Sequence, residues 1–371
     1  MMPGSPSFGA PGSDITLEVA VIEKSLSERV RRTVEDLSQR RETRVAAGAA
    51  TVAAAAAAAK RLVDGSRNGG RSGVSRTYRL RRREPLAYGV RRVARGRLES
   101  AVEHLRADDV DEVNAIHEAR KDLKKLRSAL RLVRPVLGDD TYQRENERYR
   151  DAARRLSAAR DEQVLAETID ALAERFADEA PPGGWPAIRE AVAPASAATD
   201  DDLADLRAAT AAEIETGRRE IDTLALPGDG FDVVEPGLRR AYSRGRRRFA
   251  EAAARPTDEA LHEWRKRAKD LWYHLRLLRN GWRPVLEPLT EEASALSDLL
   301  GDDHDLVVLS ERVADPAVAL SGEQIRGLGD LVDRRRGELQ ARAFRLGERL
   351  YAENPGAFAV RMRGYWDAAT A

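Results

Sequence analysis

Apolar residues recur at helical spacing along nearly the whole chain, without a convincing run of alternating β-branched residues. Alanine and leucine, which both favour helices, abound. Proline and glycine interrupt the pattern at 181–184, 227–230 and Pro256. The pattern predicts an all-α protein with helices at 85–107, 110–135, 140–176, 185–226 (with a possible break at Pro194), 234–254, 258–281, 284–314 and 321–351, and a short tail helix to Trp366.

The first 83 residues form an N-terminal extension in this interpretation. Residues 1–13 carry no helical pattern and are expected to be disordered, whereas residues 22–63 favour helix, first charged and then alanine-rich. Residues 64–84 are rich in Gly, Ser and Arg and predict a flexible basic linker. The alanine-rich run at 45–59 is short and weakly hydrophobic for a membrane span, and residues 1–14 lack the features of a secretory signal.

One long string occurs twice. The first copy, HEARKDLKKLRSALRLVR, begins at His117, and the second, HEWRKRAKDLWYHLRLLR, begins at His262, 145 residues later. A repeat of this length indicates a duplicated structural unit. We therefore divide the remaining chain, 84–371, into repeat 1 at about 84–228, repeat 2 at about 229–351 and a C-terminal tail helix.

On a helical wheel each copy separates into an apolar face and a cationic face. Leu126 and Leu271 lie at the centres of the two apolar faces. The cationic faces, which we call the two stripes, carry His117, Arg120, Lys121, Lys124 and Arg131 in the first copy and His262, Arg265, Lys266, Lys269 and Arg276 in the second.

Charge is concentrated locally, since the net charge of the chain is only +1. The first copy carries seven Lys/Arg against Glu118 and Asp122 alone. Such a stripe is either the solvated side of a bundle helix or a binding surface for a polyanion. A solvated face normally mixes signs, and like charges one turn apart destabilise a helix. Their duplication therefore favours the polyanion.

The flanking helices of the two repeats also match. GVRRVARGR (89–97) aligns with GLRRAYSRGRRR (237–248), which pairs Arg91 with Arg239 and Arg92 with Arg240. LSAARDEQVL (156–165) and LLGDDHDLVVL (299–309) share a basic residue followed by Asp. We include the four arginines among the candidate ligands. Possible supporting residues are Arg127, Arg134, Arg160, Arg279 and His304.

The duplicated H-E-x-R-K-x-x-K-x-L-x-x-x-L-R-L helix, followed one helix later by [RH]-D-x-x-V-L, resembles the conserved histidine α-helical domain (CHAD) family from about Glu84 to about Tyr351. The resemblance implies two antiparallel four-helix bundles related by a pseudo-two-fold, with a central basic cavity that binds inorganic polyphosphate through the stripe residues. It also implies association with polyphosphate granules and their proteins. Many relatives carry a triphosphate tunnel domain with an ExExK strand, but residues 1–83 lack this motif, so no triphosphatase activity is inferred.

We therefore expect a non-enzymatic polyphosphate-binding protein. Nucleic acid or another phosphorylated polyanion is the alternative, but base stacking needs exposed aromatic side chains and only Tyr273 falls on a stripe. Neither H-E-x-x-H nor a P-loop string occurs. Crowded cations disfavour metal binding by His117 and His262, although a metal bridging carboxylate and phosphate stays open. No cofactor and no membrane insertion are expected, and the absence of cysteine fits the cytoplasm.

Overall fold

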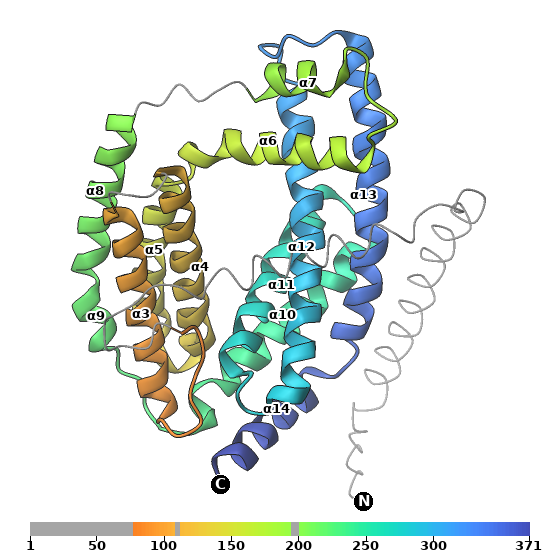
Figure 1. The fold of residues 1–371 in the computed structure, drawn as a ribbon. Coiled ribbons are helices and arrows are strands. Elements are labelled where there is room, and N and C mark those ends of the chain that lie inside the picture. The colour runs from red at the N-terminus through yellow and green to blue at the C-terminus, as the bar shows by residue number, and fades with distance from the viewer. Residues whose placement is uncertain (1–76, 108–111, 194–199) are drawn as a thin grey trace, which may run out of the picture. The chain divides into compact units, whose positions relative to one another are not determined.

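The described part of the protein is built from helices. A computed structural model describes residues 77–107, 112–193 and 200–371, and within these ranges no residue lies in a strand. The all-α prediction is confirmed (Figure 1). The α-helices are α3 (Leu86–Arg106), α4 (Glu112–Leu137), α5 (Asp139–Arg155), α6 (Ala158–Arg175), α7 (Gly184–Val192), α8 (Asp200–Thr216), α9 (Arg218–Asp222), α10 (Glu235–Ala254), α11 (Asp258–Leu278), α12 (Arg283–Val313), α13 (Gly322–Leu350) and α14 (Pro355–Thr370).

Two groups of helices follow one another along the chain. In the first group α3 and α5 each pack against both α4 and α8. In the second, α12 packs between α11 and α13. Helix α10 contacts α11 through the Phe249 and Trp264 rings, whose centroids are 5.2 Å apart. The pseudo-symmetric relation between the groups stays a prediction.

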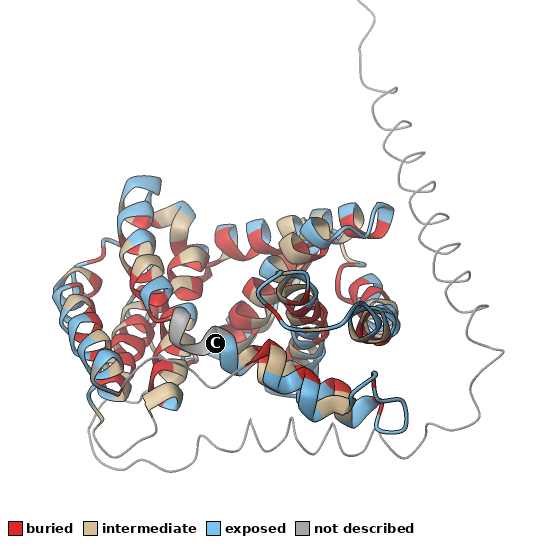
Figure 2. Ribbon diagram, turned by 90° about the horizontal axis from the view of Figure 1, so that it is seen from above, coloured by how far each residue is buried: buried red, intermediate tan, exposed pale blue. Residues whose placement is uncertain are grey.

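The two string-bearing helices bury the face that the sequence predicts. Leu126 on α4 and Leu271 on α11 are fully buried, together with the other apolar residues of the same faces. Trp264 of α11 is among the largest fully buried side chains. Figure 2 shows buried residues where neighbouring helices face one another and exposed residues on their outer surfaces. Burial of these apolar faces fixes the orientation of both stripes.

The prediction of a single helix at 140–176 is wrong, because the chain turns between α5 and α6. Leu156 at the turn is buried, and the Ser157 hydroxyl donates a hydrogen bond to the Ala153 carbonyl, 3.2 Å away. Such a side-chain bond competes with helix continuation. Helix α6 then leaves the first group and packs against α12 and α13 (Figure 1). The helix expected at 185–226, with a possible break at Pro194, is divided into α7, α8 and α9.

The flexible linker expected at 64–84 needs correction over its last eight residues. Tyr78 and Leu80 are buried. The Tyr78 hydroxyl donates to the Lys125 carbonyl, and the Leu80 amide donates to the Leu277 carbonyl at 2.9 Å. These two apolar side chains anchor an otherwise basic segment to α4 and α11. The other features expected in the extension, at 1–13, 22–63 and 64–76, lie outside the described residues.

Helix α10 approaches α4 so closely that only glycine fits at the contact. A Cβ atom on Gly237 would lie 1.6 Å from the Leu132 carbonyl oxygen.

Helix α4 also contacts α11. Arg131, the residue of α4 that precedes Leu132, forms an ion pair with Asp270 of α11. His274 of α11 hydrogen-bonds the Ser128 carbonyl, 3.0 Å from Nε2. The contact between α4 and α11 therefore joins the two groups of helices.

Candidate polyanion-binding site

The structure brings the two stripes together around Lys124 of α4 and Lys269 of α11. The Lys124 side chain is exposed to solvent, yet protein atoms surround it. Loss of hydration, followed by the charge of Lys269, lowers its pKa to about 7. Arg120 and Arg265 lower the pKa of Lys124 further. The pKa of Lys269 is also lowered, first by burial and then by Arg265. We call these four residues the central cluster.

Carboxylates neutralise other stripe residues but not the centre. Lys121 pairs with Glu118 and Lys266 pairs with Glu263, each at 2.6 Å. Within the described ranges no ion pair is formed by Lys124, Lys269 or Arg265, and the Arg265 Nε atom is buried without a hydrogen-bond partner. Arg120 donates to the Ser157 hydroxyl at 3.0 Å. Mutually repelling cations that form no ion pairs attract an anion.

The second-repeat histidines lie beside this cluster. The rings of His262 and His304 are in contact, with centroids 4.2 Å apart. Burial, then Arg265 and His262, lowers the pKa of His304 to about 4. Burial, followed by Lys266, also lowers the pKa of His262. Both imidazoles are therefore neutral near pH 7 and can donate one hydrogen bond each.

The first-repeat histidine has a different neighbour. His117 Nε2 lies 3.9 Å from a Glu118 oxygen. Its repeat-2 equivalent, His262, contacts His304, but the side chain of Arg160, which occupies the matching position in α6, lies outside the described residues. The structure thus shows the expected neighbour of one histidine only.

Two acidic residues on α12, Asp298 and Asp305, interact with the central cluster; the sequence analysis noted Asp305 as the Asp that follows His304 and missed Asp298. Asp305 offsets part of the repulsion on Lys124 and Lys269, and Asp298 does so on Lys269. Burial raises the pKa of Asp298, which is exposed to solvent, and raises that of Asp302 to about 6. Their spacing of four and three residues places all three on one helix face. That spacing was the available signal.

The C-terminal ends of the stripes have unequal roles. Arg131 forms an ion pair with the buried Asp270 carboxylate of α11, and its role as a polyphosphate ligand stays a prediction. The equivalent residue, Arg276, has no carboxylate within ion-pair distance in the described part of the chain. Its guanidinium lies over the Trp272 and Tyr78 rings, 5.1 and 5.5 Å from their centroids. Within the described ranges Arg276 forms no ion pair, whereas Arg131 does.

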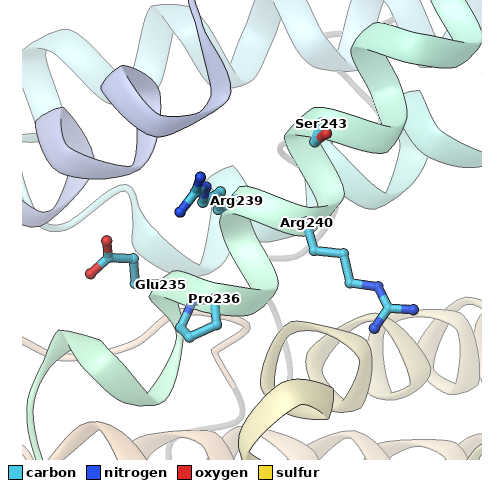
Figure 3. A pocket seen from close by; sticks show the side chains of 5 residues that line it. All are labelled: Glu235, Pro236, Arg239, Arg240 and Ser243. Carbon is cyan, nitrogen blue, oxygen red and sulfur yellow. The ribbon is translucent and has the colours of Figure 1, made fainter. Parts of the chain in front are cut away.

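The paired arginines of α3 and α10 also differ. Arg92 is buried and ion-paired with Glu84, and its role as a ligand stays a prediction. Arg91 donates to the Leu224 carbonyl at 3.1 Å. By contrast, Arg239 and Arg240 are exposed and line a pocket of about 430 Å³ on α10. Figure 3 shows their side chains pointing to different sides of the helix. This pocket is lined by Glu235, Pro236, Arg239, Arg240 and Ser243, with no stripe residue among them.

The remaining supporting arginines have protein partners. Arg127 donates to the Asn146 side chain at 3.0 Å, and Arg134 to Asp139 at 2.7 Å. Arg279 lies 3.6 Å from Glu287. Arg134 and Arg279 lie near the C-terminal ends of α4 and α11, whereas Arg127 joins α4 to α5. Within the described ranges, Lys124, Lys269, Arg265 and Arg276 form no ion pair.

A family model for the CHAD domain matches residues 92–314. The chain belongs to the CHAD family. Two curated relatives of this CHAD chain, both uncharacterized proteins from strains of Mycobacterium tuberculosis, are 26% identical to it over 280 residues. The alignment covers 70% of this chain and 53% of each relative, so the chain spans about half the length of the curated relatives it matches.

The match spans α4, α11 and α12, which hold the central cluster and its carboxylates. Among the side chains that the structure describes, no three or more His, Asp or Glu residues are grouped to hold a metal ion. No helix in the described ranges has the length and apolar character needed to cross a membrane.

Proposed function

We propose that this CHAD chain binds inorganic polyphosphate between α4 and α11 without catalysing a reaction on it. The observation that supports the proposal most strongly is the central cluster, in which Lys124, Lys269 and Arg265 repel one another without close carboxylate partners. A chain of phosphates relieves this repulsion and releases its condensed counterions. His262 and Arg276 extend the basic surface on either side of the cluster.

The proposal includes the finer architecture that the family resemblance implies. The two repeats form pseudo-symmetric antiparallel bundles, and their stripes line one central basic cavity rather than two separate sites. The coupling of Lys124 to Lys269 across the repeats supports a shared site. Residence in the cytoplasm, at polyphosphate granules and with their proteins, belongs to the same proposal and rests on the family resemblance alone.

Titration with long polyphosphate, short polyphosphate and single-stranded DNA at one salt concentration tests the proposal. We expect long polyphosphate to bind most tightly and no phosphate to be released during the incubation. If about four charges are neutralised, affinity should fall roughly fiftyfold between 50 and 200 mM salt. Tighter binding of DNA would replace the proposal by the nucleic-acid alternative.

Charge-neutralising variants locate the site. Lys124→Gln with Lys269→Gln should weaken polyphosphate binding at least about tenfold, or about 1.4 kcal/mol. The matched control is Arg326→Gln with Arg349→Gln, which removes the same charge from exposed positions on α13. Since exposed distant charges are screened, the control should change affinity less than about twofold. Equal losses in the two double variants would contradict a site at the central cluster.

A further inference from the structure

A second basic surface lies where the segment before α3 meets the junction of α11 and α12. The Leu80 amide donates a hydrogen bond to the Leu277 carbonyl at 2.9 Å, and the Asn280 side chain donates to the Leu80 carbonyl at 2.7 Å. These contacts bring two arginine-rich stretches together. The arginines of this surface, which we call the outer basic surface, are Arg79, Arg81, Arg82, Arg83, Arg279 and Arg283.

The arginines of the outer basic surface have few carboxylate partners. Arg283 Nε donates to Glu287 at 2.8 Å, and Arg279 Nη1 lies 3.6 Å from the same carboxylate. The hydrogen bond from Arg283 is the main reason that the pKa of Glu287 is lowered, and the charges of Arg279 and Arg79 act in the same direction. Within the described ranges, Arg81–Arg83 are exposed and form no ion pair. Three guanidinium groups therefore share one carboxylate, and three others face solvent.

Two further carboxylates adjoin the outer basic surface and leave its charge positive. Glu84 is ion-paired with the buried Arg92. Asp229 lies beside the start of α3, where its carbonyl accepts a hydrogen bond from the Leu86 amide at 3.0 Å. Because Arg92 neutralises Glu84, the six arginines stand against Glu287 and Asp229. The net charge of the whole chain is only +1, so this surface carries a local excess of positive charge.

Exposed aromatic side chains flank these arginines. Tyr88 and Trp282 are each 48% exposed, and they are two of the four large apolar side chains that are exposed in the described ranges. Trp282 directly precedes Arg283, and its ring meets the Tyr365 ring edge-on with centroids 4.9 Å apart. Tyr88 follows the arginine run, in the first turn of α3. Tyr and Trp combine an apolar body with a polar group, and they favour the boundary between water and an apolar phase.

We propose that the outer basic surface binds an anionic membrane surface, with its arginines at the lipid phosphates and Trp282 at the level of the headgroups. Guanidinium groups suit phosphate, and each basic residue near an anionic membrane strengthens binding about fivefold. An exposed Trp adds apolar contact with the lipid. Single-stranded nucleic acid also offers phosphates, but it binds in a basic groove, and the pocket on α10 includes none of these residues. The observations therefore favour lipid.

Co-sedimentation of the full chain with vesicles tests the proposal. We expect binding to vesicles of phosphatidylglycerol and phosphatidylcholine in equal parts, which weakens with added salt, and little binding to phosphatidylcholine alone. Replacing Arg81, Arg82 and Arg83 by Gln together should weaken binding to the anionic vesicles at least about tenfold. No binding to the anionic vesicles would overturn the proposal.

A matched control removes the same charge from exposed positions elsewhere. It replaces Arg154 of α5 and Arg326 and Arg342 of α13 by Gln. Since charges distant from the contact are screened, the control should change vesicle binding less than about twofold. Equal losses in the two triple variants would show that vesicles respond to total charge, and this result would also overturn the proposal.

Tryptophan fluorescence tests the position of Trp282. Brominated lipids quench a tryptophan that lies in the membrane, so we expect quenching when the full chain binds anionic vesicles that contain them. Trp282→Phe should remove most of this quenching, because Trp264 and Trp366 are buried. Quenching that persists unchanged in Trp282→Phe would contradict a place for Trp282 among the headgroups.

The outer basic surface and the central cluster should be separable. Lys124→Gln with Lys269→Gln should leave vesicle binding within about twofold, and the triple variant of Arg81–Arg83 should leave polyphosphate affinity within the same limit. If the triple variant lost binding to single-stranded DNA but kept binding to vesicles, the surface would belong to nucleic acid and the proposal would be overturned. Membrane binding does not rest on the proposed function, so failure of one is distinguishable from failure of the other.

Discussion

At the scale of single residues, the Lys124 side chain lowers the free energy of unfolding of the protein when no ligand is bound. Its lowered pKa means that the folded protein disfavours the protonated amine, chiefly through lost hydration and through Lys269. The unfolded chain has no such constraint. The resulting destabilisation is complete below about pH 7 and diminishes as pH rises toward about 10.4. An anion bound at the cluster would remove it.

Replacing Lys124 by Gln should therefore raise the melting temperature in the absence of ligand while weakening polyphosphate binding. The gain should be largest below pH 7 and smaller at pH 9, because the native amine is already neutral there. Thermal denaturation at both pH values measures it. Lys121→Gln serves as control, since Lys121 is paired with Glu118 and its removal should not stabilise the protein. A lower melting temperature for Lys124→Gln at pH 6 would contradict this explanation.

The sequence predicted the residues of the central cluster because both copies of the string place cations at matching wheel positions. It did not predict which of them have structural partners. Glu84 and Asp270 neutralise Arg92 and Arg131, but neither partner belongs to the repeated cationic pattern. Ion pairs between residues far apart in the sequence depend on how the helices pack, so the sequence of a single helix does not predict them.

At the scale of helices, the contact between α4 and α11 depends on a buried neutral imidazole. His274 is fully buried, and burial is the main reason that its pKa falls to about 4. Since the Ser128 carbonyl can only accept, His274 Nε2 carries the proton and donates. Protonation of the second nitrogen would place a charge between the repeats. The repeated cationic pattern does not single out this histidine, because His274 lies on the buried side of the string.

His274 should make the protein sensitive to acid. Its stabilising effect is complete above the unfolded pKa of about 6.5 and is lost as pH falls toward about 4, with a magnitude of up to about 3 kcal/mol. His274→Gln retains a donor near Nε2 and cannot be protonated, so its stability should change less between pH 6.5 and 4. Urea denaturation across this range compares the two. Parallel pH profiles would rule out His274 as the source.

Gly237 sets the distance between α10 and α4. Because a Cβ atom there would overlap the Leu132 carbonyl, Gly237→Ala must push the helices apart. We expect a loss of at least about 1–3 kcal/mol in the free energy of unfolding. Gly337→Ala on α13 is the control, since its Cβ meets nothing within 4 Å. It should stabilise the helix by roughly 0.5–1 kcal/mol. Similar effects at both positions would contradict the close approach.

The periodicity of apolar residues predicted which segments form helices, but it did not predict where the chain turns between them. The apolar pattern continues from α5 into α6, so the turn at Leu156 and Ser157 carries no proline or glycine signal. The turn follows from tertiary contacts, because α6 packs on α12 and α13 and Arg120 holds Ser157. The same limit applies to 77–84, whose Gly- and Arg-rich surroundings obscured two buried side chains.

At the scale of the whole molecule, the segment before α3 contacts both α4 and α11. Leu80 hydrogen-bonds Leu277, and the Asn280 side chain donates to the Leu80 carbonyl at 2.7 Å. Tyr78 reaches Lys125 of α4 and packs edge-on against Tyr273 of α11, with ring centroids 5.9 Å apart. Packing in the described chain therefore begins before α3, with Tyr78 and Leu80, rather than at Glu84.

Two truncated chains, 77–371 and 84–371, test this boundary. The shorter one loses Tyr78 and Leu80, and removing a buried side chain of this size typically costs about 2–5 kcal/mol. We expect 84–371 to melt several degrees below 77–371, and Leu80→Ala in the full chain to reproduce much of the loss. Because the central cluster lies in α4 and α11, both truncated chains should bind polyphosphate with similar affinity at temperatures where they are folded. Equal melting temperatures for the two chains would show that the packed segment contributes nothing to holding the repeats together.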